Sequence, residues 1–421
     1  MTSVDVLVVG AGPAGASLSF ALARAGIEAH VIDRAHFPRP KPCAEYLSPE
    51  ASRILSDMGA LERVEQTGAA ALAGVHVRAP NGAMIRGDFV AAHGFAGFRD
   101  RGLSVRREIL DAILLDRARA AGARVTEGAR VTDLLRAHDG RVTGVRTLCG
   151  GETSEHRARL VIGADGLRSV VARRAGLART LRWPRRLALV THYAGVRDIG
   201  VHGEMHVERD GYVGIADVGN GLTTVALVVP ASRSREIAGD RAAFLERWLA
   251  ERAHLAPRFA SAIRTSAVVA TGPFASHARR GWAPGLALVG DAADFFDPFT
   301  GEGIYSALRG GELLAGAVRV ALGAARPRDA DADAALAAYD AERRAEFGGK
   351  WLVERIIGAV IGTAPLINRA ARNLSRRKDL ADLLIGVTGD FVPAREVIRL
   401  GYLWKVFGRS RPLAGSRAPL A

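Results

Sequence analysis

Residues 4–33 constrain the fold more than any other part of the chain. They open with the β-branched run VDVLVV (4–9), pass through the turn GAGPAG (10–15) and the apolar segment SLSFALARAG (17–26), and end at AHVID (29–33). A continuous β-branched run is typical of a strand that is buried on both faces of a parallel sheet. The stretch therefore predicts a βαβ unit with a glycine-rich turn between its first strand and its helix.

Gly10, Gly12 and Gly15 have the spacing G-x-G-x-x-G, and each glycine has its own use in such a turn. Gly10 permits the tight turn, Gly12 lets the backbone approach a pyrophosphate, and Gly15 allows the helix to pack closely on the strand. The helix N-terminus then offers free N–H groups to a phosphate. Asp33 lies 18 residues after Gly15, where a carboxylate accepts hydrogen bonds from a ribose diol. The unit therefore predicts a dinucleotide site.

Two later stretches favour a flavin over the other dinucleotides. GADGLRS (163–169) places Asp165 after a strand, and LVGDAADFFDPFTGEGIY (288–305) places Asp291 after a strand and the turn T-G-E-G before a helix. A flavin needs a carboxylate for its ribityl hydroxyls and a helix N-terminus that stabilises negative charge on the reduced ring. We therefore predict FAD as the cofactor.

The rest of the pattern divides this dinucleotide fold into separate pieces. A helix is predicted over 107–122, and D-G at 139–140 marks a hairpin. Alternation as in TTVALVV (223–229) predicts an antiparallel sheet, and the last part of the chain is helical with breaks at Pro365 and Pro393. We predict an α/β protein: a Rossmann-type FAD-binding domain with an inserted antiparallel β-sheet substrate domain and a helical C-terminal tail. The predicted ranges are 1–75, 101–180 and 276–345 for the FAD-binding domain, 76–100 and 181–275 for the β-rich substrate domain, and 346–421 for the helical region.

Five motifs together resemble a known family. GAGPAG, REILD (107–111), GADG (163–166) and GDAADFFDPFTGEGI (290–304) are similar to motifs of the glutathione-reductase-type FAD oxidoreductases, which include the aromatic hydroxylases. DPFTGEGI, together with KPCAE (41–45), most resembles the geranylgeranyl reductase branch, where a K-x-C-G-E-like segment occupies the same region. Flavin halogenases are more distant relatives of this group. The resemblance covers about residues 1–345 and implies an FAD-dependent oxidoreductase.

The resemblance also implies which residues hold FAD. The glycine turn takes the pyrophosphate, Asp33 the adenosine ribose and Asp291 the ribityl chain. Arg107 lies along the pyrophosphate or ribityl chain, with its neighbour Arg106 as the alternative. The predicted cofactor-binding residues are Gly10, Gly12, Pro13, Ala14, Gly15, Asp33, Arg34, Arg107, Asp165, Gly290, Asp291, Gly301, Gly303 and Ile304.

The candidate catalytic residues are Cys43, Glu45 and Tyr46, in the proline-rich segment RPKPCAEYLSPE (39–50). Its prolines favour an extended chain. One interpretation places Cys43 or Glu45 beside the flavin as a proton donor or gate, because alkene reduction needs an acid as well as a hydride. The other interpretation makes Cys43 a small buried hydrophobe and pairs Glu45 with an arginine.

Two departures from the relatives keep the reaction open. Reductases of the isoprenoid type carry Y-x-W-x-F-P, whereas GYVGIADVG (211–219) has Tyr212 and no tryptophan, and Ala44 replaces a glycine. The halogenase motif W-x-W-x-I-P is absent, so halogenation is disfavoured. We expect hydride transfer to the C=C bond of a hydrophobic small molecule such as an isoprenoid, a polyketide or another secondary metabolite. The alternatives are an FAD-dependent monooxygenase (a hydroxylase or epoxidase that uses NAD(P)H and O2) and an electron-transfer flavoprotein.

Composition narrows the partners. The net charge is +14, but nearly all of it comes from scattered arginines, so we expect no nucleic acid partner. Two cysteines exclude a disulfide framework and fit a cytoplasmic setting. His202 and His206 lie in a strand-like stretch without cysteines, so no metal is predicted. NADPH or NADH is the expected reductant, and no obligatory protein partner is evident.

The tail sequence WLVERIIGAVIGTAPLINRAARNLSRRKDL (351–380) combines apolar helix with basic residues. It predicts either peripheral contact with anionic lipid or a helix pair that covers the substrate cavity. No apolar run reaches the roughly 18–20 residues that a membrane span requires.

Overall fold

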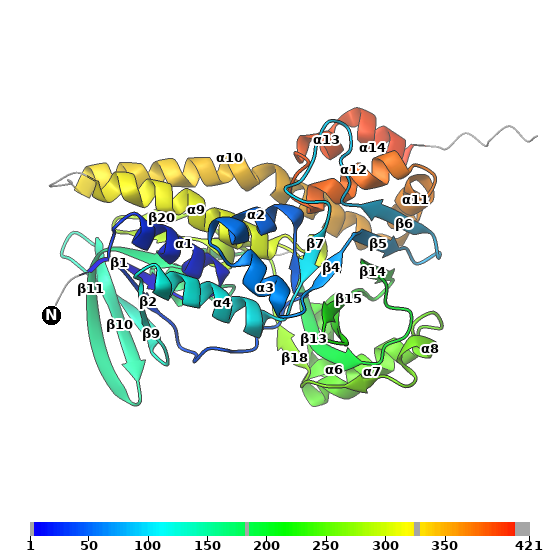
Figure 1. Ribbon diagram of the computed structural model, residues 1–421, viewed down its shortest axis with the longest axis horizontal. Helices are drawn as coiled ribbons and strands as arrows, with labels where there is room; N and C mark the ends of the chain where they lie inside the picture. Colours follow the sequence, from blue (N-terminus) through cyan, green and yellow to red (C-terminus); the bar gives the residue numbers. More distant parts are fainter. Residues whose placement is uncertain (1–3, 182–184, 324–328, 409–421) are drawn as a thin grey trace, which may run out of the picture.

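The computed structural model describes residues 4–181, 185–323 and 329–408, and it contains two eight-stranded sheets side by side. Figure 1 shows the first sheet at one end of the molecule and the second sheet at the other. In the first sheet, β1 pairs in parallel with both β2 and β11. Its strands are β20 (Trp282–Ala283), β21 (Leu286–Leu288), β11 (Glu152–Gly163), β1 (Val4–Val9), β2 (Ala29–Ile32) and β8 (Arg124–Thr126) in spatial order. In addition, β10 (Val142–Cys149) pairs with β11, and β9 (Arg130–Arg136) pairs with β10.

Alternate residues of β1 face two different layers, because side chains along a strand point to opposite faces. Val6 and Val8 pack under the helices of one face, while Leu7 and Val9 pack under the hairpin and α5 on the other. All four are buried, as the β-branched run predicts. The covering helices are α1 (Pro13–Arg24), α4 (Arg107–Ala120) and α9 (Gly303–Leu322) on the first face and α5 (Val170–Arg174) on the second.

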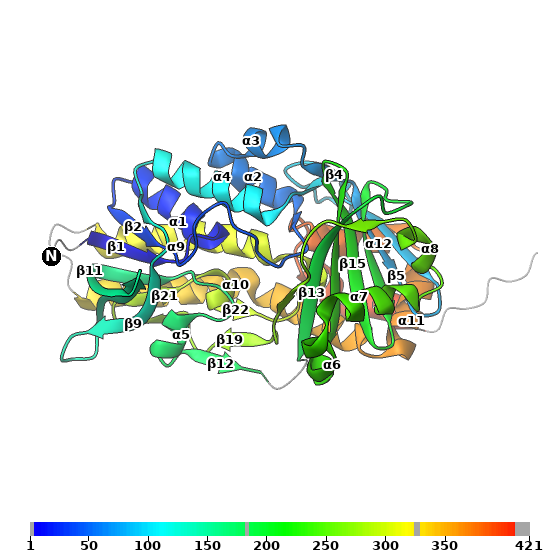
Figure 2. The same cartoon turned by 90° about the horizontal axis from the view of Figure 1, so that it is seen from below.

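The second sheet is mostly antiparallel, and Figure 2 shows its strands β13, β15 and β5 next to one another. Its one parallel pair joins β5 to β14, two strands that lie more than a hundred residues apart in the chain. The strands are β17 (Ile263–Arg264), β13 (Arg186–Ala194), β16 (Leu222–Pro230), β15 (Gly211–Gly219), β14 (His202–Glu208), β5 (Gly74–Arg78) and β6 (Met84–Asp88), with β18 (Val269–Thr271) on β13.

Both faces of the second sheet are covered. On β16, Val225, Leu227 and Val229 pack against α7 (Arg241–Ala250), and Ala226 and Val228 pack toward the C-terminal helices. The same period of two puts Ala188, Val190 and His192 of β13 on the C-terminal side. The second sheet therefore presents one face to the region where the two halves of the molecule meet.

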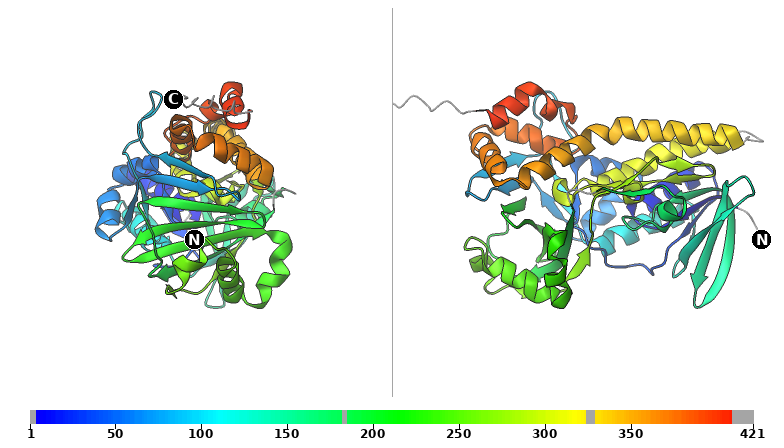
Figure 3. Two further views of the ribbon diagram at one scale, coloured as in Figure 1. Left: turned by 90° about the vertical axis from the view of Figure 1, so that its right-hand side faces the viewer. Right: turned by 180° about the vertical axis from the view of Figure 1, so that it is seen from behind.

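A helix of 33 residues, α10 (Asp329–Ile361), runs along α9 and links the two halves (Figure 3). It ends before Pro365, and a second break occurs at Pro393, as predicted. The predicted helical region 346–421 reaches into 409–421, which lie outside the described residues. The helices after α10 are α11 (Ala364–Leu374), α12 (Lys378–Thr388), α13 (Arg395–Ile398) and α14 (Leu400–Phe407).

Short elements complete the described chain. The hairpin predicted at 139–140 is confirmed by β9 and β10, and the helix predicted over 107–122 ends at Ala120. The predicted α/β fold with its β-sheet insert and C-terminal helices is confirmed, and the domain boundaries stay predictions. The remaining elements are α2 (Pro49–Asp57), α3 (Leu61–Gln66), α6 (Ser234–Gly239), α8 (Ala256–Phe259), β3 (Tyr46–Leu47), β4 (Ala70–Leu72), β7 (Gly102–Ser104), β12 (Ala178–Thr180), β19 (Ser276–Ala278), β22 (Asp294–Phe295) and the 3-10 turns η1 (Ala231–Arg233), η2 (Gly290–Ala292) and η3 (Pro298–Thr300).

Candidate functional site

The glycine turn between β1 and α1 leaves no room for side chains at two of its positions. A Cβ atom on Gly10 would lie 2.4 Å from the carbonyl oxygen of Ala164, and one on Gly15 would lie 1.9 Å from the carbonyl oxygen of Gly10. Gly10 also has φ +104°, which L side chains rarely adopt. Gly12 is different, because a Cβ there would meet nothing closer than an Arg39 side-chain nitrogen at 3.7 Å. Gly12 thus leaves its backbone open on the side of the cradle, the name used below for the region bounded by the glycine turn, Arg39, Lys41, Arg107, Asp165 and residues 290–304.

Pro13 and Ala14 form the first turn of α1 and are buried, with Gly12 as the N-cap. The predicted Asp33 lies directly behind this turn. Its Oδ2 accepts a hydrogen bond from the Ala11 N–H at 2.8 Å, and its Oδ1 accepts one from the Ala35 N–H at 2.8 Å. The carboxylate therefore fixes the turn and β2 relative to each other. Arg34 is exposed beside it.

Cations gather beside the turn. Arg107 begins α4, is 8% exposed and makes a bidentate pair with Asp111 at 2.7 and 2.8 Å. Arg39 reaches the same carboxylate at 3.1 Å, and its Nη1 is buried with no hydrogen-bond partner in the part of the chain that the structure describes. Because two arginines share the single carboxylate of Asp111, one positive charge is not neutralised, which favours the binding of an anion beside them. Arg106, the alternative to Arg107, pairs with Glu108 and is partly exposed.

Lys41 lies near these arginines and also interacts with Asp291. Burial lowers the pKa of Lys41, Arg107 lowers it further, and Asp291 raises it. In turn, burial raises the pKa of Asp291, while Lys41 and Arg107 lower it. The Lys41 Nζ also lies 3.3 Å from the place of a Cβ on Gly166. Lys41 is therefore the residue that brings GADG and GDAAD to one site.

Asp165 and the turn of residues 290–304 bound the site on its other side. The Asp165 Oδ2 accepts hydrogen bonds from the N–H groups of Val170 (2.6 Å) and Val171 (3.3 Å), whereas its buried Oδ1 has no partner among the described residues. Burial raises the pKa of this carboxyl. Gly290 and Gly301 adopt φ +63° and +75°, which glycine tolerates without strain. Gly303 and Ile304 begin α9, and Ile304 is buried.

Glu302, which precedes α9, carries an unusual carboxyl group. It is 2% exposed, and neither of its oxygens has a hydrogen-bond partner within residues 4–181, 185–323 and 329–408. Burial raises its pKa to about 8, the negative charge of Asp390 adds to this, and Lys350 offsets part of it. A cavity of about 50 Å³ borders Glu302 as well as Asp291 and Glu354. Glu302 is therefore a buried acid that holds its proton near neutral pH.

The predicted catalytic segment lies between the cradle and the second sheet. Burial raises the pKa of the Cys43 thiol, while Arg107 lowers it. The Glu45 N–H donates to the Cys43 Sγ at 3.3 Å, and Glu45 itself is 3% exposed. The Glu45 Oε1 accepts a hydrogen bond from the Arg107 N–H at 3.1 Å. Cys43 and Glu45 are thus brought to the same place as the predicted cofactor residues.

Tyr46 points away from Cys43 and Glu45. Its hydroxyl donates to the carbonyl oxygen of Thr388 in α12 at 3.2 Å, and its ring stacks on Phe89 at 5.9 Å. A Cβ on Gly301 would lie 2.7 Å from the Tyr46 ring. Tyr46 therefore packs against the flavin-side turn, with its hydroxyl engaged by the C-terminal helices.

The structure adds residues beyond the predicted site residues, and of these only Tyr212 already stood out in the sequence, as a tyrosine without the tryptophan of the related motif. Tyr212 of β15 donates to Asp297 at 2.6 Å, Arg186 of β13 pairs with the other oxygen of Asp297 at 2.5 Å, and His192 of β13 contacts Glu45 at 2.8 Å. These contacts join the second sheet to the cradle, and no spacing in the sequence reveals them. Lys41 had a signal, because lysine is rare in this arginine-rich chain: it occurs only at positions 41, 350, 378 and 405. Two of those four lysines, Lys41 and Lys350, lie inside this region.

The histidines do not form a metal site in the described ranges. His202 and His206 lie on β14, as expected, and each pairs with a separate carboxylate, Asp88 and Glu204. No group of three or more histidine, cysteine, aspartate or glutamate side chains is close enough to hold a metal ion within the described residues.

The donor set fits FAD. An open glycine backbone and the unpartnered nitrogen of Arg39 suit a pyrophosphate, and the unpartnered oxygen of Asp165 suits a hydroxyl group. The start of α9 directs free N–H groups toward the same region, where they would stabilise negative charge on a reduced flavin. These groups come from four separate stretches of the chain, and the fold brings them together.

Comparison with known proteins agrees with this site. The family model described as FAD binding domain matches residues 3–348. Digeranylgeranylglycerophospholipid reductase 2 of Methanopyrus kandleri is 32% identical over 316 residues, which cover 73% of this chain and 75% of the relative. The corresponding reductase of Methanothrix thermoacetophila is 34% identical over 322 residues, which cover 75% and 77%.

A flavoprotein/dehydrogenase of Cytophaga hutchinsonii has the same fold, with a TM-score of 0.79 and 21% identity over 96% of this chain and 95% of that one. The family match spans more than half of the chain, and the reductases are similar over two thirds or more of both partners. The chain therefore belongs to the FAD-binding family of flavoprotein oxidoreductases, in the branch of the digeranylgeranylglycerophospholipid reductases.

Proposed function

We propose that this enzyme reduces C=C bonds in the polyprenyl chains of a lipid-like substrate. The observation that carries the proposal is the position of residues 41–45, which join the FAD cradle at Lys41 to the second sheet at Glu45. When bound in its reduced form, FAD supplies a hydride to one carbon of the double bond. The chain must then supply a proton to the other carbon.

Two protonatable groups lie where that proton is needed. Because burial raises the pKa of the Cys43 thiol, the thiol keeps its proton at neutral pH. Glu45 is buried beside it and is reached by the Arg107 N–H. Oxygen insertion would instead require a site that excludes water and needs few acids. The acids of this segment therefore favour reduction over monooxygenation.

The substrate class follows from the relatives and from the second sheet. The relatives are named as reductases of digeranylgeranylglycerophospholipid, a polyprenyl lipid. In this chain Val190 and Val228, on the face of the second sheet that also carries His192, form one apolar cluster with the C-terminal helices. An apolar face suits a long hydrocarbon better than a polar small molecule. We propose NADPH or NADH as the reductant that reloads the flavin.

The test uses the FAD-loaded enzyme with a digeranylgeranylglycerophospholipid in detergent micelles. Dithionite reduces the flavin without oxygen, so the choice of natural reductant does not affect the result. We expect products heavier by two hydrogens per reduced double bond in mass spectrometry. An oxygen-containing product in air would support the monooxygenase instead, and flavin turnover without any change of the lipid would support electron transfer.

We also propose that helices α11 and α14 contact an anionic lipid surface. The two helices pack together, and the Asn373 side chain of α11 donates to the carbonyl oxygen of Val406 at 2.8 Å. Leu400 and Trp404, four residues apart on α14, are 85% and 76% exposed. A helix with large exposed apolar residues and neighbouring cations is suited to lie in a membrane interface.

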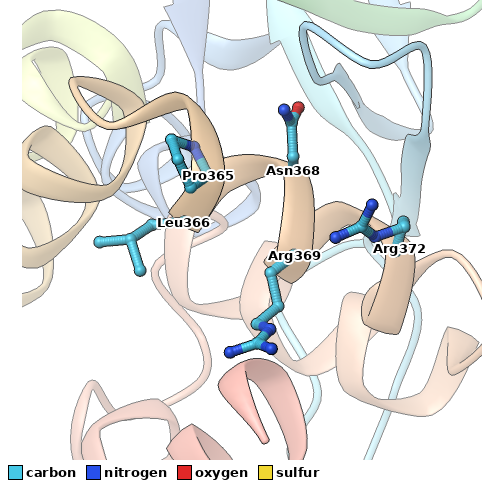
Figure 4. Close-up of a pocket in the computed structure, with 5 residues that line it drawn as sticks. All are labelled: Pro365, Leu366, Asn368, Arg369 and Arg372. Atoms are coloured by element: carbon cyan, nitrogen blue, oxygen red, sulfur yellow. The ribbon is translucent and has the colours of Figure 1, made fainter. Parts of the chain in front are cut away.

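The neighbouring cations line an open groove of about 360 Å³ on α11 (Figure 4). Arg369 and Arg372 line it together with Leu366, which is 41% exposed. Neither arginine has an acidic partner in the described part of the chain. No single described helix is long and apolar enough to cross a bilayer; α10 and α11 pass that test only as a pair bent by 109°. The proposed contact is therefore peripheral.

Vesicle flotation tests this contact. The double variant Leu400→Ser/Trp404→Ser should lose most binding to vesicles that contain anionic phospholipid, because buried apolar area drives interfacial binding. Arg369→Ala/Arg372→Ala should weaken binding to anionic vesicles only, by about 1 kcal/mol for each cation. Ile263→Ser is the control, because Ile263 is 71% exposed on β17. Equal flotation of all variants would exclude this surface.

A further inference from the structure

Glu45 has a backbone conformation and a degree of burial that the rest of its segment does not explain. It has φ +64°, a left-handed conformation that is unusual for a residue other than glycine, and its side chain is 3% exposed. Such strain persists only where the surrounding contacts hold it, and it is frequent at functional sites. The backbone conformation turns the Glu45 carboxylate toward the second sheet, away from the chain that precedes it.

A chain of hydrogen bonds starts at this carboxylate. The Glu45 Oε2 lies 2.8 Å from the His192 Nε2, and the His192 Nδ1 lies 3.1 Å from the Ser266 Oγ. His192 lies on β13, and Ser266 lies between β17 and β18. Exposure rises along the chain, from 3% for the Glu45 side chain to 17% for that of His192, and Ser266 is partly exposed. The three groups form a continuous polar path from solvent to the buried segment.

We propose that Ser266 and His192 relay protons from solvent to Glu45, which acts as the proton donor of the reduction. The inference rests on the proposed function. One carbon of the double bond takes the hydride of reduced FAD, and the electron pair of the π bond takes the proton of Glu45 at the other carbon. His192 then returns a proton to the Glu45 carboxylate and regains one from water through the Ser266 hydroxyl. No further reductant is required.

Other groups contact this path as well: the Ser266 Oγ also accepts a hydrogen bond from the His192 backbone N–H at 3.0 Å and lies 3.1 Å from the Thr191 Oγ1. Glu45 faces Arg107 of α4, His192 of β13 and Cys43 of its own segment. Arg264 of β17 donates to the carbonyl oxygen of Ser266, so a cation lies at the outer end of the path. Cys43 has no part in the relay. Because its thiol is the alternative donor, Cys43→Ser separates the two assignments.

A purely structural role for His192 makes a different prediction from a relay. As a clamp, His192 would only need to donate one hydrogen bond to Glu45, and the amide of a glutamine can do the same. As a relay, His192 must gain and lose a proton, which an amide cannot do. His192→Gln therefore keeps the clamp and removes the relay.

The activity test compares wild type and His192→Gln on a digeranylgeranylglycerophospholipid in micelles, with dithionite-reduced FAD. For the relay we expect kcat to fall about 100-fold, within the range of general acid catalysis, while KM and the Kd for FAD stay within twofold. Ser266→Ala should show a smaller loss. Added imidazole should restore turnover of His192→Ala, because this side chain is partly open to solvent. His206→Gln is the matched control, since His206 makes a similar 2.8 Å contact with Glu204 on the same sheet.

A second readout needs no flavin. In histidine-selective NMR of the FAD-free protein, the ring signals of His192 should move in both Glu45→Gln and Ser266→Ala, and those of His206 should not. The relay would be overturned by a wild-type kcat in His192→Gln. It would also be overturned if the His192 signals stayed unchanged in both Glu45→Gln and Ser266→Ala. A wild type that reduces no double bond would instead overturn the proposed function. Loss of turnover in Cys43→Ser with full turnover in Glu45→Gln would move the donor role from Glu45 to Cys43.

Discussion

The two ends of the FAD site are built in different ways. The proposed pyrophosphate end is made of backbone: Gly10 and Gly15 are required by contacts with carbonyl oxygens, and the Asp33 carboxylate accepts hydrogen bonds from two backbone N–H groups, those of Ala11 and Ala35. The proposed reacting end is made of side chains from distant segments, such as Glu45 with His192 and Tyr212 with Asp297. Close backbone contacts tolerate almost no substitution, whereas a side-chain network allows separate groups to be changed one at a time.

The largest effect is expected from Gly15→Ala at the backbone end. The new Cβ would lie 1.9 Å from the Gly10 carbonyl oxygen, so the strand and the helix must move apart. We expect loss of bound FAD and a fall in stability of several kcal/mol, which is about the upper range for single substitutions. The flavin-to-protein absorbance ratio and thermal unfolding of the purified variant would measure both.

Gly12→Ala is the companion change, since its Cβ meets nothing closer than 3.7 Å. This variant should unfold near the wild-type temperature but bind FAD weakly, because the methyl group lies where the backbone must approach the pyrophosphate. If Gly12→Ala bound FAD normally, the pyrophosphate would not lie against this turn, and the contrast between the two ends would fail.

At the reacting end, Glu302→Gln should change how the stability of the FAD-free protein depends on pH. Burial raises the pKa of Glu302 to about 8, well above the value of about 4.3 for an exposed glutamate. Between these values the unfolded chain ionises Glu302 and the folded chain does not, so the free energy of unfolding falls as pH rises from about 4.3 to 8 and then levels off.

Glutamine cannot ionise, so Glu302→Gln should remove this loss. The variant should gain on the order of a few kcal/mol over wild type at pH 8, and no such gain at pH 4. Thermal unfolding across this range is the measurement, and Glu312→Gln is the control, since Glu312 of α9 is partly exposed and paired with Arg53 of α2. Parallel pH profiles for wild type and Glu302→Gln would show that Glu302 is ionised in the fold.

The smallest of these effects is expected from Tyr212→Phe. It removes a hydrogen bond of 2.6 Å to Asp297, while Arg186 still neutralises that carboxylate. We expect a loss of about 1.5–3 kcal/mol in the free energy of unfolding, as for a hydrogen bond to a charged group, with FAD retained. Tyr193→Phe is the matched control, because the buried Tyr193 hydroxyl has no partner among the described residues. Equal losses in both variants would remove the special role of the Tyr212 contact.

The contrast between the two ends also explains what the sequence could predict. A turn such as GAGPAG is readable because a few consecutive residues determine its backbone, and β1, α1 and Asp33 lie where the motif places them. The breaks at Pro365 and Pro393 are readable for the same reason. The role of His192 could not be predicted in this way, because it depends on which face of β13 meets the segment of Glu45, 147 residues away. Period-two alternation identifies the face of a strand but not its opposite partner.

The interleaved path of the chain has a consequence for its synthesis. β5, which pairs with β6, lacks its parallel neighbour β14 until residue 208 has been made, and β11 lacks its neighbour β21 until residue 288 has been made. At about 5–20 residues per second, the ribosome needs roughly 6–26 s to make the chain between each strand and its later neighbour. Both sheets therefore spend this time with unpaired edges, and nascent chains of this enzyme should depend on chaperones more than a protein whose domains are completed one after the other.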